Sequence, residues 1–173
     1  MADRKYPYGH IVFNGLSRAM KLFLVPADGA TPQLRHTLEA HDVGINDGLL
    51  PDQYGTNSKC PPGTYFVGEP QACAIRQPDG SVREQNDDDK AYGCFFTPLS
   101  DEVPDGPMEQ HGRKGIGVHG GGSGSTAPFA MHQGWYATLG CIRLQNQDNE
   151  QVFVPFVKYI LDHGGMVEIS VSW

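Results

Sequence analysis

The sequence predicts a mainly β protein, built as a sandwich or from mixed sheets, with one or two short helices. The chain has 173 residues, a length that suits one domain with a substantial hydrophobic core. Its 22 glycines and 13 prolines are many for this length and indicate frequent turns, which are typical of β architectures rather than helical bundles. No internal repeat or linker is visible, so we expect residues 1–173 to form a single domain.

Short apolar runs predict the strands. Residues 10–13 and 19–25 flank the segment 14–17, Asn-Gly-Leu-Ser, which has the composition of a hairpin loop. Similar runs predict strands at 63–67, 73–76, 92–99, 115–119, 137–144 and 166–171. Residues 26–59 show weak periodicity and many turn residues, so we expect a long surface excursion with one short helix near 33–39.

A C-terminal helix is predicted by the apolar residues between 152 and 161, whose spacing places them on one face. Asp148 is the expected N-cap of this helix, with Gln151 three residues later. Pro155 lies inside the pattern and should kink the helix or begin a second one. The Gly-Gly pair at 164–165 supplies a C-terminal stop.

Charge and composition exclude several classes of function. A net charge of −7 and the lack of a basic cluster argue against nucleic acid binding. No apolar run reaches the roughly 18 residues needed to span a membrane, and residues 1–7 lack the apolar core of a secretory signal peptide. The acidic run 87–89 lacks the alternating spacing of a calcium loop, and no Cys-x-x-Cys pair indicates zinc. We therefore expect no metal and no cofactor.

Three of the four cysteines have structural interpretations. Cys60 and Cys73 bracket a hairpin-like segment, and they could form a disulfide in an oxidising compartment or remain two partly buried thiols. The sequence leaves both alternatives open. Cys94 stands beside two phenylalanines and resembles a small core residue.

The fourth cysteine, Cys141, is the candidate nucleophile. It follows Gly140, and glycine allows backbone to approach a ligand closely. A free cysteine is only a few per cent thiolate at neutral pH, so catalysis also needs a base, positioning and amides that stabilise an oxyanion. The N–H groups of Gly140 and Cys141 are the candidate oxyanion donors. Among seven histidines, His119 ends an apolar strand before a glycine-rich loop and is the expected base, with His132 as its rival.

Two motifs resemble the L,D-transpeptidase (YkuD-like) catalytic domain family. They are Val118-His119-Gly120 followed, after a spacer, by Thr138-x-Gly140-Cys141-Ile142-Arg143-Leu144-x-Asn146-x-Asp148, and earlier Pro61-Pro62-Gly63-Thr64-Tyr65-Phe66-Val67. The first is similar to the family's catalytic signature, which lies here within residues 115–150, and the second resembles one of its strands. The resemblance extends over most of residues 10–172 and is weakest at 26–59.

This resemblance implies a β-rich domain around a catalytic loop, with one helix beside it. It implies a cysteine acyl-transferase acting on peptidoglycan stem peptides, either an L,D-transpeptidase or an L,D-carboxypeptidase. Cys141 would release D-alanine from a tetrapeptide stem and form a thioester, while His119 moves the proton. The carbonyl of Gly120 would orient the histidine, Thr138 would support the loop, and Arg143 would shape the site or contact a stem carboxylate. Carbapenem-type lactams are the implied inhibitors.

Two features depart from the family. The spacer from His119 to Cys141 holds 21 residues, is longer than usual and is rich in Gly and Ser, so we expect a mobile flap. Trp135, Tyr136 and His132 are candidate wall residues for the stem peptide; for the two aromatics, packing beneath the loop is the open alternative. The second departure is the missing export signal, although the substrate lies in the periplasm or cell wall. A leaderless antibacterial effector delivered by a non-classical route, or a phage-borne enzyme, would fit.

Two alternatives to this activity remain. The chain could be a Cys-His amidase that cuts another stem bond, although the signature carrying Arg143 disfavours it. It could instead be a wall-binding module that has lost turnover, although intact Cys141 and His119 disfavour that reading.

Overall fold

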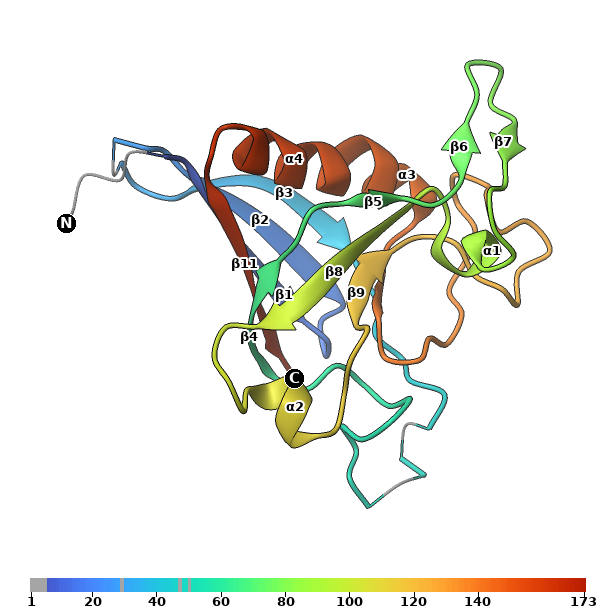
Figure 1. Ribbon diagram of the computed structural model, residues 1–173, viewed down its shortest axis with the longest axis horizontal. Coiled ribbons are helices and arrows are strands. Elements are labelled where there is room, and N and C mark those ends of the chain that lie inside the picture. Colours follow the sequence, from blue (N-terminus) through green and yellow to red (C-terminus); the bar gives the residue numbers. More distant parts are fainter. Residues whose placement is uncertain (1–5, 29, 47, 50) are drawn as a thin grey trace.

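The computed structural model describes residues 6–28, 30–46, 48–49 and 51–173. Within them a single nine-stranded mixed sheet curls through the molecule in the order β10-β9-β8-β4-β11-β1-β2-β3, with β5 added on β8 (Figure 1). The strands are β1 (Tyr8–Asn14), β2 (Ala19–Val25), β3 (Gln33–Glu39), β4 (Gly63–Val67), β5 (Gln71–Ala72), β8 (Phe95–Asp101), β9 (Gly117–His119), β10 (Ile142–Arg143) and β11 (Met166–Ser172). A separate hairpin consists of β6 (Ile75–Arg76) and β7 (Val82–Arg83). The predicted mainly β, mixed-sheet architecture is confirmed.

The first and last strands are neighbours in the middle of the sheet. β1 pairs over its full length with β2 in antiparallel and with β11 in parallel orientation. β11 in turn pairs antiparallel with β4. Along β1 every second residue is buried, which is the period-two pattern of a strand with one face on the core. The chain therefore closes on itself, and segments distant in sequence support the same sheet.

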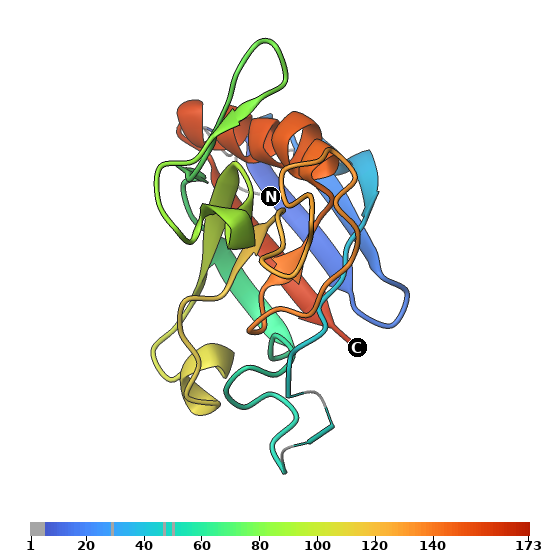
Figure 2. The same cartoon turned by 90° about the vertical axis from the view of Figure 1, so that its right-hand side faces the viewer.

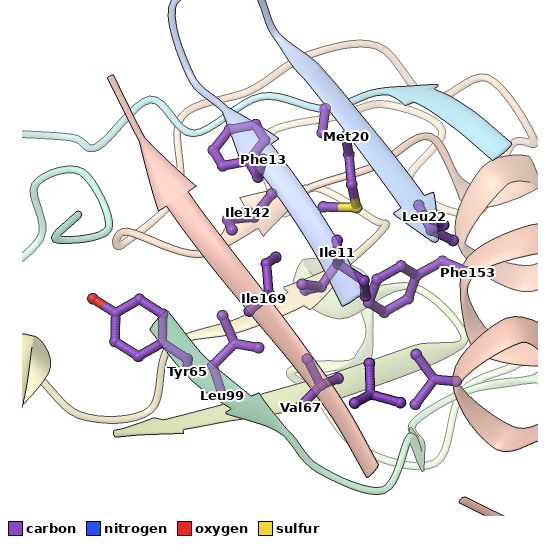
Figure 3. Close-up of a cluster of buried hydrophobic side chains, with 14 of the residues drawn as sticks. Ile11, Phe13, Met20, Leu22, Tyr65, Val67, Leu99, Ile142, Phe153 and Ile169 are labelled. Atoms are coloured by element: carbon purple, nitrogen blue, oxygen red, sulfur yellow. The ribbon is translucent and has the colours of Figure 1, made fainter. Parts of the chain in front are cut away.

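One hydrophobic cluster fills the space between the sheet and the C-terminal helix (Figure 3). Ile11, Phe13 and Ile169 are fully buried from the sheet side, and Phe153 reaches in from the helical side. Each such side chain contributes about 1.5–3 kcal/mol by leaving water. The last helix packs on β11 and β1 and runs across the strands (Figure 2).

The C-terminal helical segment begins earlier than predicted. It consists of α3 (Asn146–Asp148), a π-helical turn η1 (Asn149–Phe153) and α4 (Val154–Asp162). The prediction of Asp148 as N-cap is wrong, because Gln145 holds that place and Asp148 lies in the first turn without a capping hydrogen bond. Pro155 lies in the first turn of α4, directly after the π-helical turn, where a missing N–H costs little. The sequence predicts a kink or a second start here; the helical backbone is continuous, and its hydrogen-bond pattern changes before this proline. The wider η1 turn joins the two helical pieces.

The predicted helix near 33–39 is wrong, because these residues form β3. This strand pairs antiparallel with β2 at the edge of the sheet. Both of its faces are largely exposed, and Leu38 alone among its residues is buried. An edge strand of this kind lacks the alternation of a half-buried strand, so its sequence carries little period-two signal.

Other boundaries follow the predictions in part. The strands predicted at 19–25 and 63–67 coincide with β2 and β4. The strand predicted at 92–99 begins at Phe95, because the short helix α1 (Asp89–Tyr92) occupies the preceding residues. Of the run 137–144, only β10 is a strand, while Thr138 forms an isolated bridge with Gly44. A second short helix, α2 (Pro107–Gln110), follows β8.

Several features named in the sequence have a defined place. All four cysteines are free thiols: Cys60, Cys73, Cys94 and Cys141. The disulfide that the sequence allows between Cys60 and Cys73 is therefore not formed.

Within the described residues, no helix is long and apolar enough to cross a membrane. The same part of the chain contains no group of three or more His, Cys, Asp or Glu side chains suited to a metal ion. The sequence of residues 1–7 lacks the apolar core of a signal peptide, and the first five of these residues lie outside the described part of the structure.

Candidate active site

A pocket of about 530 Å³ lies where the ends of β9 and β10 meet α1 and three loop segments. Its lining residues are Ile45, Thr56, Asn57, Ala91, Tyr92, Gly112, Arg113, Lys114, Gly115, His119, Ser123, Ala137, Thr138, Leu139, Cys141 and Arg143. The residues come from the 26–59 excursion, from α1, from the segment before β9 and from the loop before β10. The pocket therefore gathers Cys141 and His119 into one cavity.

Parallel pairing of two short strands brings these two residues together. β9 and β10 pair with Val118 opposite Ile142 and His119 opposite Arg143. His119 is the last residue of β9, and Cys141 directly precedes β10. The backbone N–H of Leu144 donates to the carbonyl of His119 at 2.9 Å and extends this pairing. Residues that are 22 positions apart in the chain are thereby held on two neighbouring strands.

His119 is buried and held in one tautomer. Its Nδ1 lies 2.6 Å from the carbonyl oxygen of Gly120, and since a carbonyl only accepts, Nδ1 carries the proton of the neutral ring. Nε2 is then unprotonated. Burial lowers the pKa of His119 to about 4, and the charge of Arg143 acts in the same direction. The ring of Tyr92 packs edge-on against the imidazole of His119, with 5.2 Å between the ring centres. His119 is therefore a neutral base near pH 7.

Cys141 is a buried thiol rather than a preformed thiolate. Its Sγ donates a weak hydrogen bond to the carbonyl of Gly115 at 3.7 Å. Burial raises the pKa of the Cys141 thiol to about 11, and the backbone N–H of Gly117 only partly opposes this effect. A thiol with this pKa and a neutral imidazole in the same pocket do not form an ion pair. Its nucleophilicity depends on proton transfer as the sulfur attacks.

Thr138 organises the backbone on both sides of Gly140. Its Oγ1 accepts the N–H of Gly140 at 3.0 Å and donates to the carbonyl of Cys141 at 2.8 Å. The sequence predicts support of the loop by Thr138, and these contacts provide it. The first hydrogen bond also occupies the Gly140 amide, one of the two amides predicted to bind an oxyanion. Among the described contacts, the amide of Cys141 has no such partner.

Gly140 could not be replaced by another residue without rearrangement. Its φ of 102° lies in the region that favours glycine. A Cβ at this position would collide with the Arg113 guanidinium and with the carbonyl oxygen of Ser58. The close approach therefore requires glycine immediately before the candidate nucleophile.

Comparison with known proteins now identifies the family. A family model of the L,D-transpeptidase catalytic domain matches residues 24–155, more than half of the chain. The chain belongs to this family. The curated proteins contain no significant match. The matched residues include β9, the spacer and β10, whereas β1 and β11 lie outside the match but occupy the middle of the same sheet.

Solved structures share the fold of this L,D-transpeptidase domain. The helical cell shape determining protein Pgp2 from Campylobacter jejuni is 17% identical, with a TM-score of 0.58, over 98% of this chain and 51% of its own. Bd1075 from Bdellovibrio bacteriovorus is also 17% identical, with a TM-score of 0.53, over 98% of this chain and 48% of its own. The present chain thus spans about half the length of these proteins. At such identities the likeness describes the fold alone.

Three predicted wall residues of the L,D-transpeptidase domain lie elsewhere. Trp135 stacks on His41 with 3.7 Å between ring centres and an angle of 7°. Tyr136 covers the glycine-rich spacer and is 40% exposed. His132 is exposed. None of the three is among the described residues that line the pocket. The structure therefore places His119, and not its rival His132, in the pocket with Cys141.

The long spacer, which the sequence predicts to be a mobile flap, makes hydrogen bonds to the rest of the domain at several points. The fully buried Asn146 accepts the N–H of Gly121 at 2.8 Å and donates to the carbonyls of Pro128 and Ala130 at 2.8 and 2.7 Å. Arg76 donates to the carbonyl of Phe129 at 2.8 Å. In Figure 2 the spacer, drawn in orange, lies on the near side beneath α4. The spacer is thereby tied to the start of the C-terminal helix and to the β6–β7 hairpin.

Two further residues escaped the sequence analysis. Arg113 is buried and donates to the carbonyls of Tyr54, Gly55 and Lys59 at 2.8–2.9 Å and to that of Leu139 at 3.0 Å. It joins the 26–59 excursion to the loop that carries Cys141. Tyr92 lies against His119 in the pocket wall. Neither residue has a local sequence signal, because each contacts residues that are distant in the sequence.

Proposed function

We propose that this protein is a cysteine acyl-transferase of peptidoglycan stem peptides, acting as an L,D-transpeptidase or an L,D-carboxypeptidase. The observation that carries the proposal is the placement of the Cys141 thiol and the neutral, Nδ1-protonated His119 in one pocket. Membership of the L,D-transpeptidase catalytic domain family supports the substrate class. We further propose that residues 1–173 form one catalytic domain that works in the periplasm or cell wall, where this substrate lies.

The first half of the reaction forms a thioester. Sγ of Cys141 attacks the carbonyl carbon between the third stem residue and D-alanine, while Nε2 of His119 accepts the thiol proton. The negative charge on the carbonyl oxygen is stabilised by backbone N–H groups, of which the Cys141 amide is the candidate. The C–N bond then breaks, and the imidazolium of His119 gives its proton to the leaving amine. D-Alanine departs and the stem remains as a thioester.

The second half resolves that thioester. An amine of a neighbouring stem, or water, attacks the thioester carbonyl while Nε2 of His119 accepts its proton. The C–S bond breaks, and the proton returns to the sulfur. Attack by an amine gives transpeptidation, and attack by water gives carboxypeptidation. The hydrogen bond from Nδ1 to Gly120 holds the ring in the required tautomer throughout both halves.

Incubation with purified tetrapeptide muropeptides tests the proposal. Mass spectrometry should detect free D-alanine with the wild-type protein and none with Cys141→Ala. Release that survives this substitution would refute the nucleophile. Cleavage of a different stem bond would instead favour the Cys-His amidase, and binding without turnover would favour a wall-binding module. A covalent carbapenem adduct on Cys141, located by peptide mapping, is an independent test of the reactive thiol.

A matched pair of histidine variants tests the base. His119→Ala should abolish thioester formation, because no other described imidazole lines the pocket. His132→Ala should leave the rate within about twofold, since this exposed side chain lies outside it. The reverse pattern would assign the base to the spacer.

A further inference from the structure

The pocket concentrates positive charge in an acidic protein. The chain has 20 acidic and 13 basic residues, excluding histidine. The pocket is nevertheless lined by Arg113, Lys114 and Arg143, and none of its described lining residues is Asp or Glu. This segregation of charge favours an anionic ligand, because a cleft lined by one sign of charge attracts the opposite sign.

The two arginines are held by backbone carbonyls rather than by carboxylates. Arg113 donates to four carbonyl oxygens, and Arg143 donates to that of Gly121. The Nε of Arg143 is buried without a partner in the described structure. Two carboxylates act on this region but have other partners: Asp42, whose charge reaches Cys141, accepts the N–H of Cys60, and Asp52, which interacts with the charge of Arg113, pairs with His111. Carbonyl dipoles do not cancel a unit charge, so an anion in the pocket would offset part of the cost of burying these cations.

Lys114 is the cation that remains available. It is exposed, lines the pocket, and makes no hydrogen bond or ion pair with any described residue. Two other lysines differ, because Lys90 and Lys158 are each 3.7 Å from a glutamate. The ammonium group of a lysine carries three N–H donors on a flexible stem, so at the pocket wall it can reach and bind the carboxylate of a ligand.

We propose that Lys114 is a specificity-determining residue that binds a free carboxylate of the acyl-donor stem peptide. The inference rests on the proposed function and names the substrate class more closely: donors that keep this carboxylate are selected over donors in which it is amidated. A tetrapeptide stem whose third residue is a diamino dicarboxylic acid, and whose second residue is amidated, offers two such groups. One is the side-chain carboxylate of the third residue, and the other is the terminal carboxylate of the fourth.

Binding measured without turnover tests this role. Three synthetic tetrapeptides are titrated calorimetrically into the Cys141→Ala protein: one with both carboxylates free, one amidated on the third side chain, and one with a C-terminal carboxamide. Adding Lys114→Met should weaken binding of the free peptide about five- to tenfold, as expected for the loss of one charge-assisted hydrogen bond. Lys114→Arg should keep most of the affinity, and Lys21→Met, an exposed lysine on β2, is the matched control.

The amidated peptides identify the carboxylate. The peptide that lacks the group bound by Lys114 should bind more weakly to the parent protein and should show no further loss with Lys114→Met. Equal loss for all three peptides would mean a packing contact and would overturn the inference. Unchanged affinity in the Lys114→Met protein would overturn it as well.

The outcome is separable from that of the proposed function. In the intact enzyme, Lys114→Met should raise KM for D-alanine release with little change in kcat. If the wild-type protein releases no D-alanine but the Cys141→Ala protein shows the Lys114 dependence, the activity is refuted and the carboxylate site stands. If D-alanine is released and neither KM nor affinity responds to Lys114, the activity stands and the carboxylate site is refuted.

Discussion

Nδ1 of His119 lies 2.6 Å from the carbonyl oxygen of its own neighbour in the chain, Gly120. A carbonyl fixes the tautomer of the ring as a carboxylate would, but it adds no negative charge that would stabilise an imidazolium. Burial and the nearby Arg143 charge therefore determine the protonation state, and they keep the ring neutral. The site starts from a thiol and a neutral imidazole, with consequences that can be measured.

The pH profile of the acylation step is the first prediction. His119 must be neutral to accept a proton, so the rate should fall only as the pH drops toward its pKa of about 4. The Cys141 thiol, with a pKa of about 11, should stay protonated through the neutral range. We expect kcat/KM for D-alanine release to be flat between about pH 6 and 9. A profile that rises through pH 6–7 would show a histidine of ordinary pKa and contradict this description.

Stability should depend on pH through the same histidine. The pKa of His119 is near 6.5 in the unfolded chain and about 4 in the folded protein. Between these two values the unfolded chain binds a proton at His119 and the folded protein does not, so lowering the pH favours unfolding. The stability contributed by neutral His119 is thus complete above pH 6.5 and is lost as the pH falls toward 4. The loss amounts to about 3 kcal/mol.

Urea denaturation of wild type and His119→Gln at pH 7 and pH 4.5 measures this effect. All other titrating groups are shared, so the difference between the two proteins isolates residue 119. The wild type should lose about 2–3 kcal/mol more than the variant over this interval. Equal losses would mean that the folded protein accommodates a charged ring.

How much the sequence predicted depends on how local each signal is. The strands at 19–25 and 63–67 carry their own apolar patterns, and the Gly-Cys motif marks Cys141 without reference to the rest of the chain. β3 was missed because an exposed edge strand has little alternation. Arg113 was missed because its partners are backbone carbonyls, which every residue possesses. The pairing of Thr138 with the Gly140 amide likewise depends on loop geometry that spacing does not encode.

Thr138 offers a test of the loop that carries the candidate nucleophile. Thr138→Val keeps the shape of the side chain but removes the hydroxyl, which leaves the buried Gly140 N–H and the Cys141 carbonyl without this partner. Each buried group that loses its partner costs about 1–3 kcal/mol. We expect lower stability by thermal unfolding and at least a tenfold slower acylation. Thr138→Ser retains the hydroxyl and should behave almost as wild type; if it were as impaired as Val, the methyl group rather than the hydrogen bonds would be responsible.

Asn146 tests whether the glycine-rich spacer is a fastened segment or a mobile flap. Its side chain is fully buried and bonds the N–H of Gly121 and the carbonyls of Pro128 and Ala130. Asn146→Asp is nearly isosteric, keeps the acceptor for Gly121, and replaces two donated hydrogen bonds by repulsion between oxygens. Loss of those contacts should release the middle of the spacer while β9 and β10 stay paired.

Limited proteolysis and activity, measured together, distinguish the two descriptions. Asn146→Asp should be cut within 122–131 at least tenfold faster than wild type, and acylation should slow because His119 opens the same spacer. As a control, Asp162→Asn changes an exposed residue at the end of α4 and should leave cleavage unchanged. Cleavage of the wild-type spacer as fast as that of the variant would show that these three hydrogen bonds do not restrain it, and the flap predicted from the sequence would then be the better description.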